Sequence, residues 1–291
     1  MSTSAATKRA EPTKTLERIP MMSRQEFYST IGSLEKPVIF VDAMKDWPST
    51  KKWTADWFRT AHGDATVTVE WLKYTEDAQS QTGVKRAGTV RKMKLREYVD
   101  SLQEKNTPDV GYLIGKDMYA VLPELLNDLR FPDYASEKRM TEQLFFMGPP
   151  GTFTQLHLDR AHNLHAQIVG SKRWQLYSPA RDAQLRPMKL DFVWSVVSQY
   201  DLAPSGGNPD VLPNNVEPDY DFVLEAGEIL YIPYGWWHRV LTVDTSISTN
   251  LWWWTWSMLG RIGPVLVPSL AQSFIKGLKK KAVRRGYYGE S

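Results

Sequence analysis

The central feature of this sequence is the six-residue run Thr154-Gln155-Leu156-His157-Leu158-Asp159. It lies among short segments with strand character, and successive side chains of a β-strand point to opposite faces. His157 and Asp159 are therefore predicted to lie on one face, where an imidazole and a carboxylate can share a cation. An isolated His-x-Asp pair also occurs by chance on sheet surfaces, so this motif needs support from the rest of the chain.

A third metal ligand is predicted in the run Gly235-Trp236-Trp237-His238-Arg239-Val240. His238 opens a later strand directly after a turn, and in a jelly roll such a strand can lie beside the first one. Two histidines and one carboxylate with open positions are the arrangement expected of non-haem Fe(II) oxygenases. The sequence therefore predicts one iron site made of His157, Asp159 and His238.

The composition restricts the ligand types that are available. The chain has 291 residues, five His and no Cys, which excludes disulfides, thiolate metal sites and a Cys nucleophile. Its net charge of +3 is too small to predict nucleic-acid binding. It has no run of about 18 uncharged apolar residues, so no membrane span is expected. A cytoplasmic location is the default expectation.

The second half of the chain predicts a β-rich fold. Short strands separated by Gly and Pro turns indicate a sandwich, barrel or jelly roll. They are expected at residues 144–147, 154–158, 164–169, 173–177, 221–224, 229–232, 238–243 and 246–254. The first half alternates helical and extended signals. Helices are expected after Ser23 and Thr54 and at 94–102 and 123–129, strands at 37–41 and 67–71, and a loop at 75–89.

The expected organisation is one catalytic domain with appendages. Residues 1–15 are polar and predict a disordered tail, and 16–256 form the domain, with a jelly-roll core at about 144–256. Residues 188–220 are interpreted as an insert over the mouth of the core. The segment 257–291 is predicted to be helical, with an apolar stripe that either forms a homodimer through 257–285 or packs on its own domain.

From Lys36 to Trp254 the sequence resembles the JmjC/cupin-like hydroxylase family, the group that includes the asparaginyl hydroxylase of hypoxia-inducible factor. The resemblance rests on four stretches of sequence. They are Lys36-Pro37-Val38-Ile39 through Asp46-Trp47-Pro48, Gly148 through Asp159, Asn163 through Trp174, and Gly227-Glu228-Ile229-Leu230-Tyr231-Ile232-Pro233 with Trp237-His238. The resemblance implies mainly β structure with flanking helices, built on a double-stranded β-helix (jelly roll) of the cupin/JmjC type.

The resemblance also implies a pocket for 2-oxoglutarate. Lys172 matches the lysine that binds the distal carboxylate, and Thr154 matches a hydroxyl that bonds the same group. The other pocket positions that it implies are Tyr112, Asn163, His165 and Asn250. Each of these also has an ordinary structural interpretation, as core, turn or strand residues. His162 is expected in an exposed loop, and His62 at a surface helix end.

The chemistry implied by the resemblance uses Fe(II), 2-oxoglutarate and O2, and yields succinate, CO2 and a hydroxylated substrate. The expected substrate is an amino-acid side chain in a peptide, protein or small metabolite. Acidic residues of the 188–220 insert suggest a basic side chain as the guest. Demethylation of N-methyl-lysine or arginine, a cupin enzyme without 2-oxoglutarate, a non-catalytic cupin binding module and a nucleic-acid binder remain alternatives.

Overall fold

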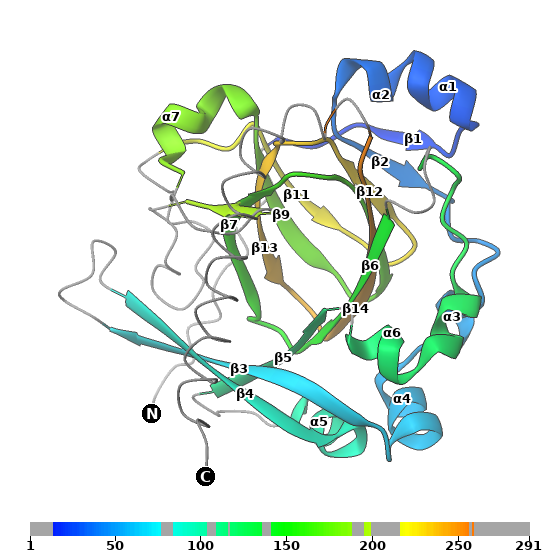
Figure 1. The fold of residues 1–291 in the computed structure, drawn as a ribbon, viewed down its shortest axis with the longest axis vertical. Coiled ribbons are helices and arrows are strands. Elements are labelled where there is room, and N and C mark those ends of the chain that lie inside the picture. The colour runs from blue at the N-terminus through cyan, green and yellow to red at the C-terminus, as the bar shows by residue number, and fades with distance from the viewer. Residues whose placement is uncertain are drawn as a thin grey trace, which may run out of the picture.

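Two β-sheets face each other at the centre of the molecule (Figure 1). The structure is a computed structural model and describes residues 14–76, 84–103, 109–115, 117–135, 141–187, 195–198, 216–255 and 258. The larger sheet has the strand order β1-β2-β12-β8-β14-β6-β5-β3-β4, and the smaller sheet has the order β10-β7-β13-β9-β11. The mainly β jelly roll that the family resemblance implies is confirmed.

The strands of the larger sheet come from both halves of the chain. They are β1 (Arg18–Pro20), β2 (Val38–Val41), β3 (Thr66–Glu76), β4 (Val84–Lys94), β5 (Asp109–Gly115), β6 (Thr141–Gly148), β8 (His162–Val169), β12 (Ile229–Ile232) and β14 (Ser246–Trp253). Five of the nine precede residue 116, so the N-terminal half supplies much of this sheet. The smaller sheet contains β7 (Phe153–Asp159), β9 (Lys172–Tyr177), β10 (Ser195–Val197), β11 (Tyr220–Leu224) and β13 (Trp237–Thr242).

The helices are short and lie around the sheets. They are α1 (Arg24–Ser29), α2 (Ile31–Leu34), α3 (Pro48–Lys52), α4 (Ala55–His62), α5 (Leu95–Ser101), α6 (Asp117–Val121) and α7 (Asp182–Leu185), with 3-10 helices η1 (Pro123–Asp128) and η3 (Pro179–Arg181). Figure 1 shows α5 beneath β3 and β4, and α3, α4 and α6 beside the larger sheet. Among the described residues, no helix is both long enough and apolar enough to span a membrane.

Local sequence signals account for several of these elements. Ser23 and Glu26 form a reciprocal capping box at the start of α1, as predicted. Thr54 accepts a hydrogen bond from the backbone of Trp57 and begins α4. The expected helix at 123–129 is present as the 3-10 helix η1 with Pro123 in its first turn. The eight strands expected after residue 144 are all present, with ends shifted by no more than three residues.

Four expectations about segments need correction or stay untested. The loop expected at 75–89 is wrong where it is described, because Thr75 and Glu76 belong to β3 and residues 84–89 belong to β4. At the end of the tail expected at 1–15, Lys14 forms a β-bridge with Asp221, and residues 1–13 lie outside the described residues. The helical segment and dimer expected at 257–291 lie outside the described residues, apart from Met258, and so does most of the 188–220 insert.

The principal core lies on the outer side of the larger sheet and is rich in aromatic side chains. Trp47, Trp53 and Trp253 are fully or almost fully buried there, and Phe27 stacks on Tyr134 with ring centroids 4.0 Å apart. Burying such large rings contributes a large share of the hydrophobic stabilisation.

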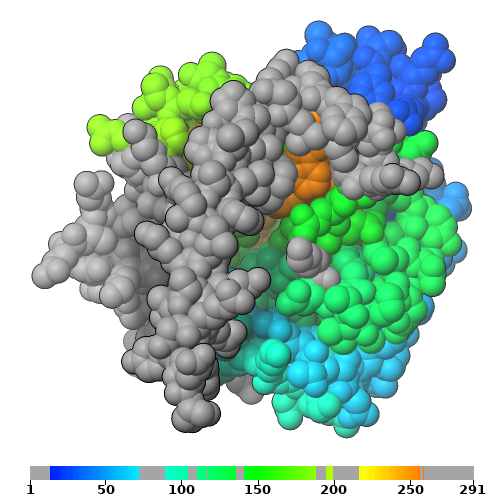
Figure 2. Space-filling model, in the orientation of Figure 1, coloured from blue at the N-terminus to red at the C-terminus, as the bar shows by residue number. Residues whose placement is uncertain are grey.

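In Figure 2 the surfaces of β6 (green) and β14 (orange) lie side by side on the face towards the viewer.

The turn between β8 and β9 holds its position through Gly170, whose φ is +68°. A Cβ at this position would meet the backbone carbonyl of Thr245 well inside van der Waals distance. Gly151 has a comparable φ of +85° but has open space around it. We expect Gly151→Ala to cost about 1–2 kcal/mol from the left-handed backbone alone, and Gly170→Ala to cost about 1–3 kcal/mol more.

Urea unfolding of both variants measures this difference. If both variants lose the same free energy of unfolding, the close approach of the Thr245 carbonyl does not constrain residue 170.

Candidate metal centre and adjoining cavity

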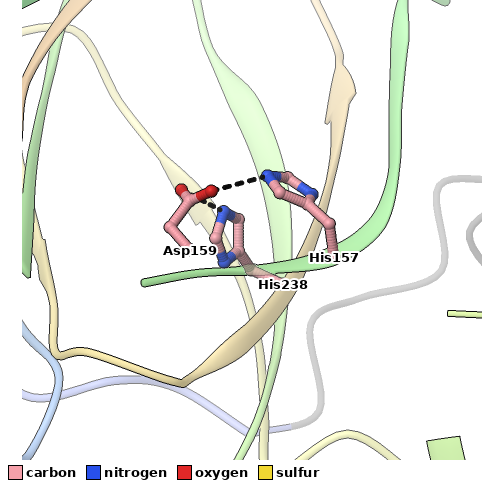
Figure 3. Close-up of side chains that lie close together, drawn as sticks. All are labelled: His157, Asp159 and His238. Carbon is pink, nitrogen blue, oxygen red and sulfur yellow. Dashed lines mark ion pairs between the residues drawn. The ribbon is translucent and has the colours of Figure 1, made fainter. Parts of the chain in front are cut away.

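Three side chains from two neighbouring strands meet on the inner face of the smaller sheet. The antiparallel pairing of β7 with β13 sets His157 directly opposite His238. Asp159 lies two residues after His157 on the same strand and thus on the same face. The three residues predicted from sequence to share a metal are therefore brought together, and they point toward one another (Figure 3).

The distances suit a single small cation. The ligand atoms of His157, Asp159 and His238 all lie within 4.8 Å of one another. Asp159 Oδ1 is 3.7 Å from His157 Nε2, and Asp159 Oδ2 is 3.6 Å from His238 Nε2. Among the described residues this is the one group of three or more His, Asp or Glu side chains with such geometry.

Backbone carbonyls orient both imidazoles. The Nδ1 atom of His157 lies 2.7 Å from the Gln155 carbonyl oxygen, and that of His238 lies 3.1 Å from the Trp236 carbonyl oxygen. A proton on each Nδ1 satisfies these acceptors and leaves the Nε2 lone pairs directed into the site. Metal-binding histidines are commonly held in this tautomer by such a bond.

Burial shifts the pKa values of the side chains at the site. Desolvation raises the pKa of Asp159 above its usual range, while the nearby His157 and the Ser195 hydroxyl lower it. Desolvation also holds the pKa of His238 well below its usual range, so His238 is neutral, the form that binds metals. A buried carboxylate beside neutral imidazoles is stabilised by a divalent cation, so the donor set fits the metal that the sequence predicts.

The triad forms one side of a cavity of about 190 Å³. Its other walls are Tyr112, Ile114, Leu144, Phe146, Thr154, Asn163, His165, Lys172, Trp174, Ser195, Val240, Asn250 and Trp252. All six side chains that the family resemblance assigned to a 2-oxoglutarate pocket are among these. Their presence in one cavity is a finding, while their roles in binding stay predictions.

Lys172 brings a buried ammonium group to this cavity. It is 1% exposed, and its Nζ donates to Ser248 Oγ at 2.9 Å and to Tyr112 Oη at 3.2 Å. Burial alone lowers the pKa of Lys172 to about 7. No described carboxylate forms an ion pair with it, so an anionic group of a ligand is the natural partner for this cation.

Several buried polar atoms along the cavity also lack a partner among the described residues. They are Asn163 Oδ1, His165 Nε2, Asn250 Oδ1 and Trp252 Nε1. Buried polar groups are normally hydrogen-bonded, because an unmade bond costs about 1–3 kcal/mol. Unpartnered atoms beside a cation at one end and a metal triad at the other fit a polar, anionic ligand that reaches the metal.

The two remaining histidines, His162 and His62, do not line this cavity. The expectation that His162 lies in an exposed loop is wrong: it opens β8, is 8% exposed, and stacks on Trp253 with ring centroids 5.1 Å apart. His62 ends α4 as predicted, although its ring packs against Trp57 with 17% of the side chain exposed.

Two hydroxyl residues that bond to predicted site residues were not themselves predicted from the sequence. Ser248 shares its face of β14 with Asn250, so strand alternation could have identified it. Ser195 lies in β10, a three-residue strand that no pattern indicated. Its hydroxyl donates to Asp159 Oδ1 at 2.8 Å.

Comparisons with known proteins agree with this geometry. A family model described as a cupin-like domain matches residues 24–257. A protein named lysine-specific demethylase 8 from Xenopus tropicalis is 32% identical over 75% of this chain and 48% of its own length. Its namesake from Danio rerio is 33% identical over 83% of this chain and 59% of its own length.

A third relative is the human tRNA wybutosine-synthesizing protein 5, which is 27% identical over 81% of this chain and 76% of its own length. The chain spans about half the length of the two demethylase relatives.

Removing the one carboxylate ligand should abolish metal binding. We expect Asp159→Ala to lose stoichiometric Fe(II) or Mn(II) binding without loss of fold, because the change also removes a desolvated charge. Glu225→Ala, which removes an exposed carboxylate, is the matched control. Metal analysis and circular dichroism measure the two effects. Full iron occupancy and activity in Asp159→Ala would contradict the assignment.

Proposed function

Because the chain belongs to the cupin-like domain family of JmjC type, whose members use Fe(II) and 2-oxoglutarate, we propose that it is an oxygenase that hydroxylates a C–H bond of an amino-acid side chain. The substrate would be a peptide, a protein or a small metabolite. The observation that carries the proposal is a single cavity with His157, Asp159 and His238 on one wall and the buried ammonium of Lys172 on another.

The residues divide the work by their positions in the cavity. His157, Asp159 and His238 would hold iron on one side, leaving its remaining positions toward the cavity. Lys172, with Tyr112 and Thr154, would bind the distal carboxylate of 2-oxoglutarate. When bound, the iron supplies the redox chemistry that couples conversion of 2-oxoglutarate to succinate and CO2 with oxidation of the substrate. The aromatic walls would exclude bulk water from this reaction.

The proposal of hydroxylation rests on the resemblance of residues 36–254 to the JmjC/cupin-like hydroxylases. The names of the Xenopus and Danio relatives favour the alternative, removal of a methyl group from lysine. The name of the human relative raises a tRNA substrate instead, against which we weigh the small net charge of +3. Similarity to the asparaginyl hydroxylase of hypoxia-inducible factor remains a prediction.

The acidic residues of the insert give less support for a substrate with a basic side chain than the sequence suggests. Two acids of the insert region are already engaged: Asp219 pairs with Arg181 at 2.8 Å, and Asp221 pairs with Arg173 at 2.7 Å. Asp191, Asp201 and Asp210 lie outside the described residues. We therefore keep the proposed substrate at the level of an amino-acid side chain. The cytoplasmic location and the homodimer through 257–285 also remain proposals.

The buried ammonium should control binding of the co-substrate. We expect Lys172→Met to weaken 2-oxoglutarate binding by about 3–5 kcal/mol, because the distal carboxylate loses its charge partner. Since burial lowers the pKa of Lys172 to about 7, wild-type affinity should fall as pH rises above that value. Calorimetric titration with Mn(II) in place of iron measures both effects.

Two controls make this test specific. Lys45→Met removes an exposed lysine and should change nothing. Lys172→Met itself should lose the pH dependence that arises from residue 172. Unchanged binding of 2-oxoglutarate in Lys172→Met would count against the assignment.

The reaction type is tested by the product. Mass spectrometry of the reacted substrate should show the gain of one oxygen atom, with succinate formed in equal amount. Peptide and metabolite pools provide the screen, and Asp159→Ala provides the inactive control. Formaldehyde together with loss of a methyl group would favour demethylation over the proposal.

A further inference from the structure

The short strand β10 places a hydroxyl group against the metal-binding carboxylate. β10 pairs with β7 on the side opposite β13, and its register sets Ser195 opposite Asp159 and Val197 opposite His157. Ser195 Oγ lies 2.8 Å from Asp159 Oδ1. The carboxylate is 5% exposed, so this hydroxyl replaces a bond that water would otherwise make.

The two oxygens of Asp159 are not equivalent in this arrangement. Oδ1 accepts the Ser195 hydroxyl and also lies 3.7 Å from His157 Nε2, whereas Oδ2 lies 3.6 Å from His238 Nε2. The backbone of the same residue is fixed as well, since the Asp159 carbonyl accepts the Gly235 N–H at 3.1 Å. With the backbone held on one side and Oδ1 held on the other, rotation of the carboxylate is restricted.

We propose that Ser195 is a positioning residue for the metal centre: by engaging Oδ1 it fixes the orientation in which the Asp159 carboxylate would meet the metal. Residues that orient a ligand in this way typically change metal affinity about 10- to 100-fold when they are lost. The proposal rests on the metal centre of the proposed function, and it is independent of the substrate.

The position of β10 does not depend on the Ser195 hydroxyl. Val196, on the opposite face of the strand, is 8% exposed and packs with Leu158 and Trp237 in an apolar cluster. The backbone ladder to β7 holds the same strand. Removing one hydroxyl should therefore leave β10 in place, so an effect on metal binding can be separated from an effect on folding.

The experiment compares two substitutions of equal size. Ser195→Thr keeps the hydroxyl, and Ser195→Val removes it while keeping the branched shape. Mn(II) binding is measured by calorimetry, and the ligand-field absorption of Co(II) reports the coordination. Ser198→Ala is the control, since the Ser198 hydroxyl donates to the Leu185 carbonyl and to no residue of the metal triad.

We expect Ser195→Val to bind Mn(II) about 10- to 100-fold more weakly than wild type and to change the Co(II) spectrum. Ser195→Thr should stay close to wild type, and Ser198→Ala should bind normally. Equal Mn(II) affinity in the Thr and Val variants would overturn the inference, and so would an equal loss in Ser195→Val and Ser198→Ala. Absence of divalent-metal binding by the wild-type chain would instead contradict the metal centre itself.

Discussion

The pairing of β7 with β13 is the constraint on which the site depends. Because His157 stands directly opposite His238 in this ladder, two imidazoles separated by 80 residues of sequence become neighbours with ring centroids 4.2 Å apart. The two-residue period of β7 then adds Asp159 to the same face. A register slip of one residue would place His157 and Asp159 on the outer face of the sheet, away from His238. The metal centre is thus a consequence of strand register.

The cavity combines two desolvated groups of opposite charge that do not pair with each other. Asp159 belongs to the smaller sheet at the metal triad, while Lys172 bonds to Tyr112 and Ser248 of the larger sheet. Each is costly to bury alone, and desolvation shifts the pKa of each toward its neutral form. A cation at the triad and an anion at Lys172 would offset these costs separately. A dicarboxylate that also binds the metal meets both demands, which is why the donor set and the family's co-substrate agree.

The sequence predicted the parts of the site that depend on local pattern. Strand alternation and the two motifs identified the metal triad, and the resemblance placed six further side chains that do line the cavity. The sequence could not predict the features that depend on pairing between strands far apart in the chain. β10 has three residues and no distinctive composition, so Ser195 was missed. His162 was expected in a loop because a single His beside Asn163 carries no signal of burial, whereas the surrounding Tyr231 and Trp253 come from distant strands. The polarity of residues 75–89 predicts a loop, but polar side chains are equally suited to the paired ends of β3 and β4.

The N-terminal half of the chain is part of the site as well as of the scaffold. Tyr112 lies in β5, which joins the larger sheet through β6, and its hydroxyl accepts a hydrogen bond from Lys172. Tyr98 of α5 fixes this junction from the other side, because its hydroxyl bonds to the carbonyl of Met147 in β6 and accepts from the backbone N–H of Leu113 in β5. The end of the cavity that holds Lys172 is therefore built from both halves of the chain. The metal triad comes from the second half of the chain alone, whereas Lys172 bonds to Tyr112 from the first half, so the two ends of the cavity differ in which parts of the chain build them.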